Sequence, residues 1–280
     1  MRILVAGGEG MLAHEVIDAA RRRGHEVTPL GRGDLDITDP RSIDDAVGGN
    51  APEAVINCAA WSDVDGAEDD ERGAMKVNDE GAALLAAAAE RVGAKVVYPS
   101  SDYVFDGMKV TPYVESDLPA PISAYGRSKL GGETSVAVAN PRHFIVRSSW
   151  LYGPAGKNFV ATMLQIGREQ PEVLVVSDQI GCPTSCVDLG MALVGLVEGE
   201  DYGIHHIAGT GSCTWFEFAQ EIFDQAGYET RVMSTTSDMM ARRAPRPAYS
   251  VLVSERPRPV VLPEWRKSLR RYLADLELES

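Results

Sequence analysis

The chain has 280 residues, of which 44% are hydrophobic, and its formal net charge at pH 7 is −14. This length and apolar content are enough for one large domain, or two unequal ones, with a buried core. The negative charge repels nucleic acids and anionic membrane surfaces, which argues against a nucleic-acid reader, although local arginines can still form a site for an anionic small molecule.

The cysteines do not form a metal or redox pattern. Cys58, Cys182, Cys186 and Cys213 include no CxxC pair, so we interpret them as reduced packing thiols. The sequence contains no HExxH motif, and no apolar run approaches the ~20 residues of a membrane span. We therefore expect a soluble, cytoplasmic protein without nucleic-acid or membrane partners.

The first half of the chain alternates short apolar runs with helical patterns. Buried strands are predicted at residues 2–6, 26–30, 54–60, 95–99 and 144–147, and helices at residues 12–23, 42–47 and 79–92. Strand and helix alternating in this way predict a parallel sheet with right-handed crossovers. The expected fold class is therefore α/β, with a doubly wound parallel sheet of the Rossmann type.

Beyond about residue 150 the pattern changes, because proline and glycine become frequent and the elements become shorter. Such elements are predicted around residues 173–177, 187–197 and 214–226. We interpret this half as a smaller domain beside the carboxyl edge of the sheet, where ligands of doubly wound folds bind. The expected domains are residues 1–155 and residues 156–280, with some segments of the second returning to the first.

The stretch VAGGEGMLAHE (5–15) has the context of a dinucleotide-binding turn. Gly7, Gly10 and Ala13 follow the first predicted strand and open a helix. The first glycine permits a tight turn, the second lets backbone N–H groups approach a pyrophosphate, and the third position needs only a small residue. The helix N-terminus adds unpaired donors and partial positive charge.

The end of the second predicted strand indicates which dinucleotide is bound. NAD sites usually place an acid about 20 residues after the glycines. This chain instead reads Leu30-Gly31-Arg32-Gly33, and Arg32 is suited to a 2′-phosphate. The prediction is NADPH; the alternative is that Arg32 is an exposed loop residue and NADH is also accepted.

Two later stretches carry acid–base chemistry. Tyr125 and Lys129 are four residues apart, a spacing that puts both side chains on one face of a helix. We expect the lysine charge to lower the pKa of the tyrosine, and the hydroxyl of Ser101 to bind the same substrate oxygen. A surface pair on a helix is the alternative for the Tyr-x-x-x-Lys motif alone.

Taken together, the motifs resemble the extended short-chain dehydrogenase/reductase superfamily, and within it the dTDP-4-dehydrorhamnose reductases. The matching stretches are LDITDP (35–40), VINCAAWSDVDGAE (55–68), VN (77–78), SSDYVFDG (100–107), AYGRSKLGGE (124–133), RSSWLYG (147–153), NFVATML (158–164), DQIGCPTS (178–185), HHIAG (205–209) and RPAYSVL (246–252). They span nearly the whole chain.

This resemblance implies reduction of the 4-keto group of dTDP-4-dehydro-L-rhamnose, with Ser101, Tyr125 and Lys129 as the catalytic residues. Tyr125 would give the proton to O4, and Lys129 would also hold the nicotinamide ribose. Together with Gly7 of the turn and Arg32 after the second strand, the predicted cofactor contacts are Gly10, Met11, Leu12, Asp36, Ile37, Ala60, Trp61, Ser62, Asn78, Tyr125 and Lys129. The implied substrate contacts are Ser101, Asp102, Phe105, Trp150, Asn158 and Arg246, and the second domain would hold the sugar nucleotide.

The chain departs from this family at several positions. Ser101 replaces a commoner threonine but keeps the hydroxyl, and Pro99 removes a contact to the cofactor. Some relatives bind Mg²⁺ through acids at a dimer contact; Glu15 matches one of these positions, but Val187 stands at another, so we predict no metal. The resemblance is also compatible with a homodimer.

Residues 241–259 carry five arginines and one acid in an otherwise acidic protein. A clamp for the diphosphate of the sugar nucleotide, with Arg246 as its best candidate, is one interpretation, and a solvated basic loop is the other. His205 and His206 lie in a strand-like stretch and are predicted to be structural.

Two alternative functions remain at this stage. One is reduction of a related dTDP-4-keto-6-deoxysugar, including the ring-contracting step of dihydrostreptose formation, because such enzymes share the same residues. The other is a non-catalytic regulatory subunit with the same fold. The presence of Tyr125, Lys129 and a hydroxyl at Ser101 argues against the second alternative.

Overall fold

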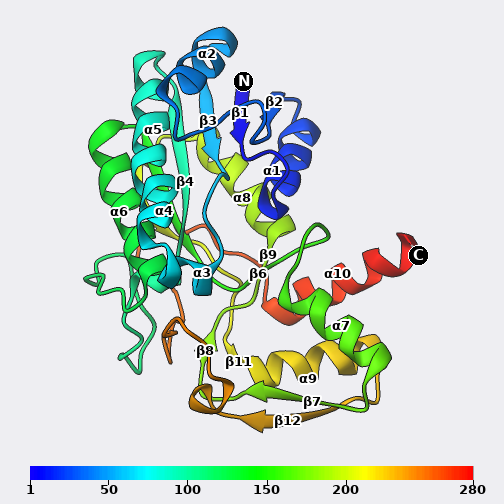
Figure 1. Cartoon of the computed structure of the whole chain (residues 1–280). Coiled ribbons are helices and arrows are strands. Elements are labelled where there is room, and N and C mark those ends of the chain that lie inside the picture. The colour runs from blue at the N-terminus through cyan, green and yellow to red at the C-terminus, as the bar shows by residue number, and fades with distance from the viewer. Residues whose placement is uncertain (280) are drawn as a thin grey trace.

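A six-stranded parallel sheet forms the centre of the computed structural model, which describes residues 1–279. Its strands are β1 (Arg2–Ala6), β2 (Glu26–Leu30), β3 (Ala54–Asn57), β4 (Lys95–Ser101), β5 (His143–Ser148) and β10 (Gly203–His206). They are ordered β10-β5-β4-β3-β1-β2, and every neighbouring pair is parallel (Figure 1). The predicted doubly wound sheet is confirmed.

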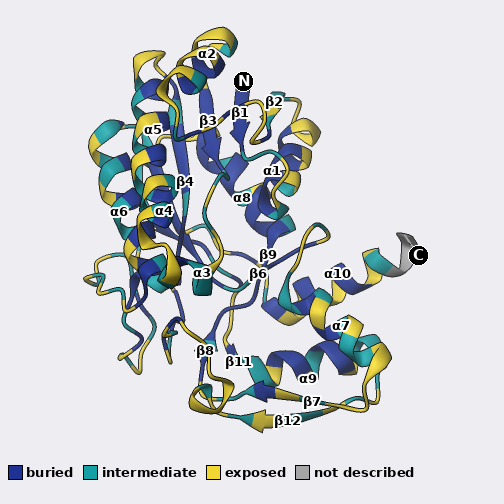
Figure 2. Cartoon of the chain, in the orientation of Figure 1, coloured by how far each residue is buried: buried dark blue, intermediate teal, exposed yellow. Residues whose placement is uncertain are grey.

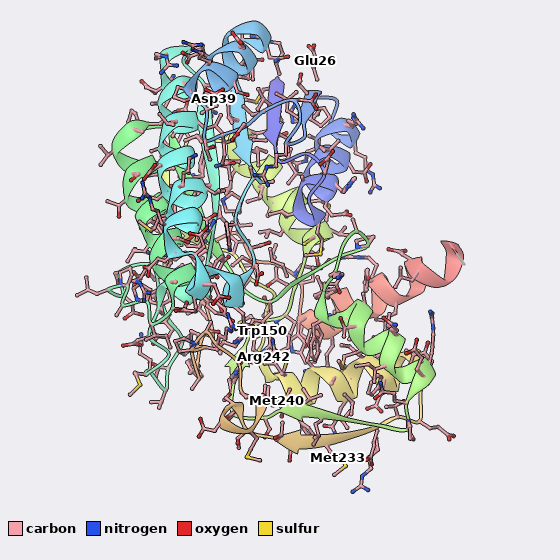
Figure 3. All side chains as sticks on the ribbon, in the orientation of Figure 1. Glu26, Asp39, Trp150, Met233, Met240 and Arg242 are labelled. Carbon is pink, nitrogen blue, oxygen red and sulfur yellow. The ribbon has the colours of Figure 1, made fainter. Side chains whose placement is uncertain are left out.

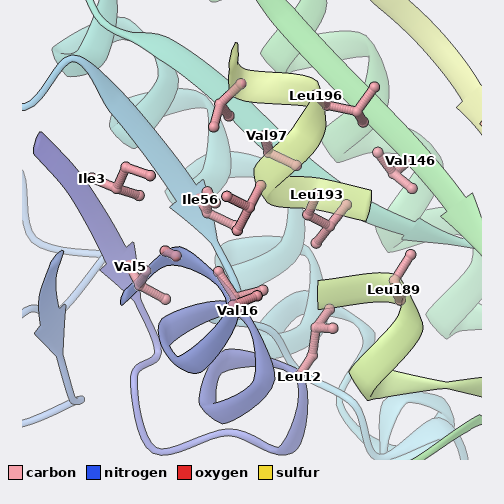
Figure 4. Close-up of a cluster of buried hydrophobic side chains, with 14 of the residues drawn as sticks. Ile3, Val5, Leu12, Val16, Ile56, Val97, Val146, Leu189, Leu193 and Leu196 are labelled. Atoms are coloured by element: carbon pink, nitrogen blue, oxygen red, sulfur yellow. The ribbon is translucent and has the colours of Figure 1, made fainter. Parts of the chain in front are cut away.

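Helices cover both faces of this sheet. On one face lie α1 (Met11–Arg22) and α8 (Cys186–Glu198); on the other lie α2 (Pro40–Asn50), α5 (Ala82–Arg91) and α6 (Ala124–Ala139). Side chains of β1 alternate between the two: Ile3 and Val5 pack in the cluster of α1 and α8 (Figure 4), whereas Leu4 and Ala6 pack in the opposite cluster. This alternation follows from the two-residue period of a strand.

The strand order reverses beside β1, which pairs with β2 on one side and with β3 on the other. In open parallel sheets such a reversal leaves a crevice at the carboxyl ends of the strands, where ligands bind. The glycine-rich turn after β1 opens at this point. The sheet therefore presents the predicted dinucleotide turn at its topological switch.

Two strands have ends that differ from the prediction. β3 stops at Asn57, three residues early, because the side-chain oxygen of Asn57 accepts a hydrogen bond from the amide of Ala59 and turns the chain out of the sheet. β4 instead continues to Ser101 by pairing with Ser148 of β5. Ser101 is consequently the last residue of a strand, held more rigidly than a loop residue.

The helix predicted at residues 79–92 belongs to a longer helical segment. It comprises α3 (Val64–Asp69), α4 (Glu71–Met75), the π-helical turn η1 (Lys76–Gly81) and α5. A π-helical turn is rare and often accompanies a functional site. Here it carries Asn78 toward α6.

A second, smaller unit lies below the sheet in Figure 1. It contains α7 (Phe159–Glu169), β7 (Glu172–Val176), α9 (Trp215–Ala226), β12 (Arg231–Thr235) and α10 (Trp265–Glu279). Strands β7 and β12 pair in parallel, and the helices enclose an aromatic core that includes Tyr152, Phe218 and Trp265. Figure 2 shows that the buried residues of the two units form separate interiors.

Short elements connect the units. They are β6 (Leu151–Tyr152), β8 (Ile180–Gly181), β9 (Thr184–Ser185), β11 (Cys213–Thr214) and the 3-10 turns η2 (Asp102–Val104) and η3 (Ser237–Met240). Two elements from beyond residue 155, α8 and β10, lie in the sheet unit: α8 packs on α1, and β10 extends the sheet next to β5. No helix in the described part of the chain is long and apolar enough to cross a membrane.

The cysteines and the paired histidines have packing roles. All four cysteines are free thiols, and three of them are buried, as predicted. His205 and His206 are buried on β10. Their ring nitrogens meet backbone oxygens, at 2.7 Å from Asp201 for His205 and at 3.1 Å from Tyr113 for His206. Their predicted structural role is confirmed.

Candidate active site

The glycine-rich turn has the geometry that a pyrophosphate requires. Gly7 adopts φ +71°, and a Cβ there would lie 2.6 Å from the backbone nitrogen of Ala59, so only glycine fits. Gly10 precedes α1 without any side-chain capping bond, which leaves the amides of Met11 and Leu12 among the unpaired donors at the helix start. These amides and the helix dipole suit an anionic group.

The loop at residues 60–62 runs along the same crevice and is fixed by one buried side chain. The amide of Asn78 accepts a hydrogen bond from the N–H of Trp61 at 2.8 Å and donates to its carbonyl oxygen at 3.0 Å. It also donates to the hydroxyl of Ser128 on α6 at 2.9 Å. Asn78 thus positions the loop, while Ala60 and Ser62 stay exposed beside it.

The end of β2 carries charges of both signs. Arg32 is exposed, as a contact to a 2′-phosphate requires. Asp36 is also exposed, and hydrogen bonds from Thr38 lower the pKa of its carboxyl group. The carboxyl group of Glu9 lies against Gly31, only 2.9 Å from where a Cβ of that residue would stand. The sequence shows no acid directly after β2. The prediction missed Glu9, an acid of the glycine-rich turn that the fold brings beside the end of β2.

Ile37 differs from its exposed neighbours, because its side chain is buried under η1. A Cβ added at Gly81 would lie 2.9 Å from its carbonyl oxygen and 3.1 Å from its side chain. The side chain of Ile37 is therefore closed to a ligand at this edge.

The catalytic residues predicted from the motifs come together at the carboxyl edge of the sheet. Ser101 ends β4, and Tyr125 and Lys129 lie on the first turns of α6, which Ser123 caps by accepting from the amide of Gly126 at 3.1 Å. Lys129 is buried; its ammonium donates to the carbonyl oxygen of Pro99 at 2.7 Å and lies 4.2 Å from the centre of the Tyr98 ring. Pro99 thus orients the lysine through its backbone.

The electrostatics of this pair differ from the prediction. Burial raises the pKa of Tyr125 to about 12, with a further increase from the charge of Asp102, and only the hydroxyl of Ser101 lowers it. Lys129 is not among the groups that shift this pKa; burial lowers the pKa of Lys129 itself to about 7. The expected lowering of the tyrosine pKa by the lysine is therefore wrong for this structure. A phenol with this pKa is protonated at neutral pH and suited to give a proton.

Asp102 supplies a buried acid next to the tyrosine. Its Oδ1 accepts from the hydroxyl of Ser101 at 3.0 Å, whereas Oδ2 has no partner within the described residues. Burial raises the pKa of the Asp102 carboxyl group to about 6.

A cavity of about 790 Å³ is formed mainly by residues beyond 155, and Tyr103 of the sheet unit completes its wall. Its lining includes Tyr103, Phe159, Gln179, Trp215, Arg242 and Arg246. The ring of Tyr103 meets that of Tyr125 edge to face at 5.5 Å, which connects the cavity to the catalytic tyrosine. The volume is of the size that small-molecule sites in proteins have.

Trp150 contributes to the cavity through a second tryptophan. Its ring stacks on Trp215 with centroids 3.6 Å apart, and its backbone is held at φ +50°. The indole of Trp215 also donates to Gln179 at 3.1 Å. Figure 3 labels Trp150, Arg242 and Met240 in this region between the two units. A strained backbone and a fixed ring are typical of a functional site.

The structure corrects one predicted substrate contact, Phe105, and gives another, Asn158, a capping role. Phe105 is fully buried and stacks on Tyr113 at 4.1 Å, beneath the guanidinium of Arg147, so its side chain has no surface for a ligand. Asn158 caps α7: its Oδ1 accepts from the amide of Ala161 and its Nδ2 donates to the carbonyl of Gly153. Both side chains have structural roles here.

Tyr103, Gln179 and Trp215 are site residues that could not be predicted from the sequence. Tyr103 lies inside a motif already used for Ser101, and Trp215 opens the predicted helix near residue 214. The one local indication was Trp215, an aromatic residue at the polar start of a predicted helix. Their convergence depends on how the two units pack, which no local pattern reveals.

Comparison with known proteins agrees with this geometry. The profile of the RmlD substrate binding domain matches residues 1–278. The dTDP-4-dehydrorhamnose reductase of Streptomyces griseus is 45% identical over 91% of this chain and 86% of its own length. The spore coat polysaccharide biosynthesis protein SpsK of Bacillus subtilis is 39% identical over 98% of this chain and 97% of its own.

A solved structure agrees equally well. The crystal structure of dTDP-4-dehydrorhamnose reductase from Bacillus anthracis in complex with NADP has a TM-score of 0.95 and 38% sequence identity. The match covers 98% of this chain and 99% of that one. The chain therefore belongs to the RmlD substrate binding domain family.

Proposed function

We propose that this chain is an NADPH-dependent reductase that converts the 4-keto group of dTDP-4-dehydro-L-rhamnose to the alcohol of dTDP-L-rhamnose. The observation that carries this proposal is the position of Tyr125. It lies at the start of α6, its ring meets the ring of Tyr103 edge to face, and Tyr103 in turn lines the cavity that contains Arg242 and Arg246. The names of the relatives support the same reaction.

The residues divide the chemistry between them. NADPH supplies the hydride for C4 when it is bound. Tyr125, protonated at neutral pH, donates the proton to O4, and the hydroxyl of Ser101 orients that oxygen. Lys129 holds the nicotinamide ribose, and its ammonium is already oriented by Pro99. Asp102 accepts from the hydroxyl of Ser101 and so supports its orientation.

The residues around the switch point fit the cofactor. Gly7 and Gly10, with the amides of Met11 and Leu12, form the pyrophosphate cradle. The loop Ala60–Trp61–Ser62, positioned by Asn78, lies along the dinucleotide, and Asp36 with the backbone of Ile37 meets the adenine side. Arg32 pairs with the 2′-phosphate.

The cavity fits the sugar nucleotide. Arg246 and Arg242 supply guanidinium groups for the diphosphate, and Trp215, backed by the stacked ring of Trp150, forms a flat apolar wall. We further propose that the sheet unit, residues 1–155 together with α8 and β10, holds the cofactor, while the remaining segments hold the substrate. A cytoplasmic location and a homodimer remain proposals, testable by cell fractionation and by sedimentation of the purified chain.

The test supplies the purified protein with NADPH and dTDP-4-dehydro-L-rhamnose and follows loss of NADPH absorbance together with the product sugar. Turnover is expected, with Tyr125→Phe as a control that binds NADPH but loses at least about a hundredfold in kcat. Turnover only with another dTDP-4-keto-6-deoxysugar would replace the substrate. Absence of turnover with every keto sugar, in a folded protein that binds NADPH, would overturn the enzyme and favour the regulatory alternative.

A further inference from the structure

The basic segment at residues 242–246 is tied to one short helix of the sheet unit. Asp65 on α3 binds Arg246 through both carboxylate oxygens, at 3.2 Å to Nη1 and 2.9 Å to Nη2. The same carboxylate accepts from the backbone amide of Ala244 at 3.0 Å. Four residues further along α3, Asp69 pairs with Arg243.

These two ion pairs are not equivalent. The side chains of Asp69 and Arg243 are 59% and 65% exposed, so solvent screens their attraction. Arg246 is only 13% exposed, and its guanidinium lines the cavity. The hydrogen bond to Arg246 is the largest influence that lowers the pKa of Asp65. Asp65 therefore holds Arg246, the more buried of its two arginine partners in the cavity wall (Arg242 lies 4.0 Å away and is 55% exposed), whereas Asp69 holds Arg243 at the surface.

The remaining donors of Arg246 point to a function for this contact. A guanidinium has five N–H groups. Asp65 takes two of them and the carbonyl oxygen of Ala244 takes a third at 2.9 Å. Nε makes no hydrogen bond within the described residues. Two N–H groups thus stay free on a side chain whose position is already fixed, which suits bidentate binding of a phosphate.

The helix that carries Asp65 is itself anchored to the catalytic helix. Asp63 caps α3 by accepting from the amide of Gly66 at 2.9 Å. Glu68 accepts from the amide of Ala124, the residue before the catalytic tyrosine, at 2.8 Å. One six-residue helix therefore fixes both Arg246 and the start of α6.

We propose that Asp65 is a positioning residue: it holds the guanidinium of Arg246 in place for the diphosphate of the substrate. The same short helix fixes the start of α6, which carries Tyr125. This inference rests on the proposed function, because it takes the ligand of the cavity to be a nucleoside diphosphate sugar. Presetting the arginine lowers the cost of immobilising a long side chain on binding. The ion pair is thus a component of the binding site as well as a bridge between the two units.

The test is a double-mutant cycle on binding of dTDP, measured by calorimetry with wild type, Asp65→Asn, Arg246→Ala and the double variant. Asp65→Asn is expected to weaken dTDP binding roughly tenfold, yet to have less than about a twofold effect once Arg246 is absent. It should raise KM for the nucleotide sugar and leave kcat and the Kd of NADPH near wild type. Asp69→Asn, an equal change of charge on the same helix, should leave dTDP binding unchanged.

Several results would overturn the proposal. Unchanged dTDP binding in Asp65→Asn would make the contact only a tie between units, and tighter binding would mean that Asp65 competes with phosphate for Arg246. An equal loss in the Arg246→Ala background would also contradict it. Thermal unfolding shows whether each variant is folded. If Asp65→Asn is unstable, Asp65→Ser takes its place in the same measurements. Failure of the wild type to bind dTDP would instead contradict the proposed function.

Discussion

Burial sets the protonation states of the catalytic pair. Tyr125 keeps its proton at neutral pH because desolvation disfavours the phenolate, and Lys129 titrates at about 7 because desolvation disfavours the ammonium. Burial therefore favours the neutral form of both groups. The tyrosine keeps a proton that it can donate, and the lysine is charged only below a pH of about 7. Binding of an anionic cofactor beside Lys129 favours its charged form.

The lysine predicts a pH dependence of cofactor binding. Lys129 is an ammonium below a pH of about 7 and neutral above it, so binding that needs the charge weakens as the pH rises. The Kd of NADPH, measured by fluorescence, should increase about tenfold between pH 6 and pH 8. Lys129→Met should bind weakly at both pH values, without this increase. The ligand titrates identically with both proteins, so a Kd that changes with pH in the same way for the wild type and for Lys129→Met would refute the assignment.

Arg32 predicts the cofactor preference. Its exposed guanidinium lies at the end of β2, and a charge-assisted bond to the 2′-phosphate exists only for NADPH. Arg32→Ala should raise KM for NADPH by roughly ten- to a hundredfold and KM for NADH far less. Steady-state kinetics give KM for NADPH and for NADH with the same protein. The value for NADH is the control for each variant. Equal changes for the two cofactors would exclude a bond from Arg32 to the 2′-phosphate.

At the scale of elements, close packing of α6 against η1 places the catalytic helix. A Cβ at Gly132 would lie 2.1 Å from the backbone oxygen of Asn78 and 2.3 Å from the hydroxyl of Tyr98. That hydroxyl donates to the same backbone oxygen at 2.8 Å. The absence of a side chain at Gly132 therefore lets α6 approach η1, and Asn78 then reaches both the cofactor loop and Ser128.

This packing predicts opposite effects for two glycine substitutions. Gly132→Ala forces a methyl group into backbone and should destabilise the protein by about 1–3 kcal/mol, or more if α6 shifts. Gly48→Ala, in an open position on α2, should stabilise it by up to about 1 kcal/mol through helix propensity. Thermal unfolding should show melting temperatures that move in opposite directions. Two shifts of the same sign would contradict the packing described here.

At the scale of the whole molecule, local features were predictable and distant contacts were not. The unit of β1, glycine turn and α1 lies within about 20 consecutive residues, and its pattern of apolar residues and glycines was sufficient to predict it. Asp65 and Arg246 are 181 positions apart in the sequence, and no pattern at either position indicates the other. The same holds for Trp150 on Trp215 and for Glu9 beside Gly31.

Burial likewise required the folded chain. Phe105 lies in a motif of the family, so the sequence suggested a ligand contact, but tertiary packing encloses its ring. The pKa of Tyr125 also depends on how much water the cavity admits, which the Tyr-x-x-x-Lys spacing alone does not determine. The arrangement of the two units therefore decides which motif residues meet a ligand and which support the fold.

The central claim is that NADPH and Tyr125 together reduce C4 of a dTDP-linked keto sugar. The most direct measurement is a single turnover with dTDP-4-dehydro-L-rhamnose and NADPH deuterated at nicotinamide C4, followed by NMR of the product sugar. Using each stereospecific label in turn, the account predicts deuterium at C4 of dTDP-L-rhamnose from one of the two, and almost no product with Tyr125→Phe. Product without deuterium from either label, or undiminished turnover in Tyr125→Phe, would contradict it.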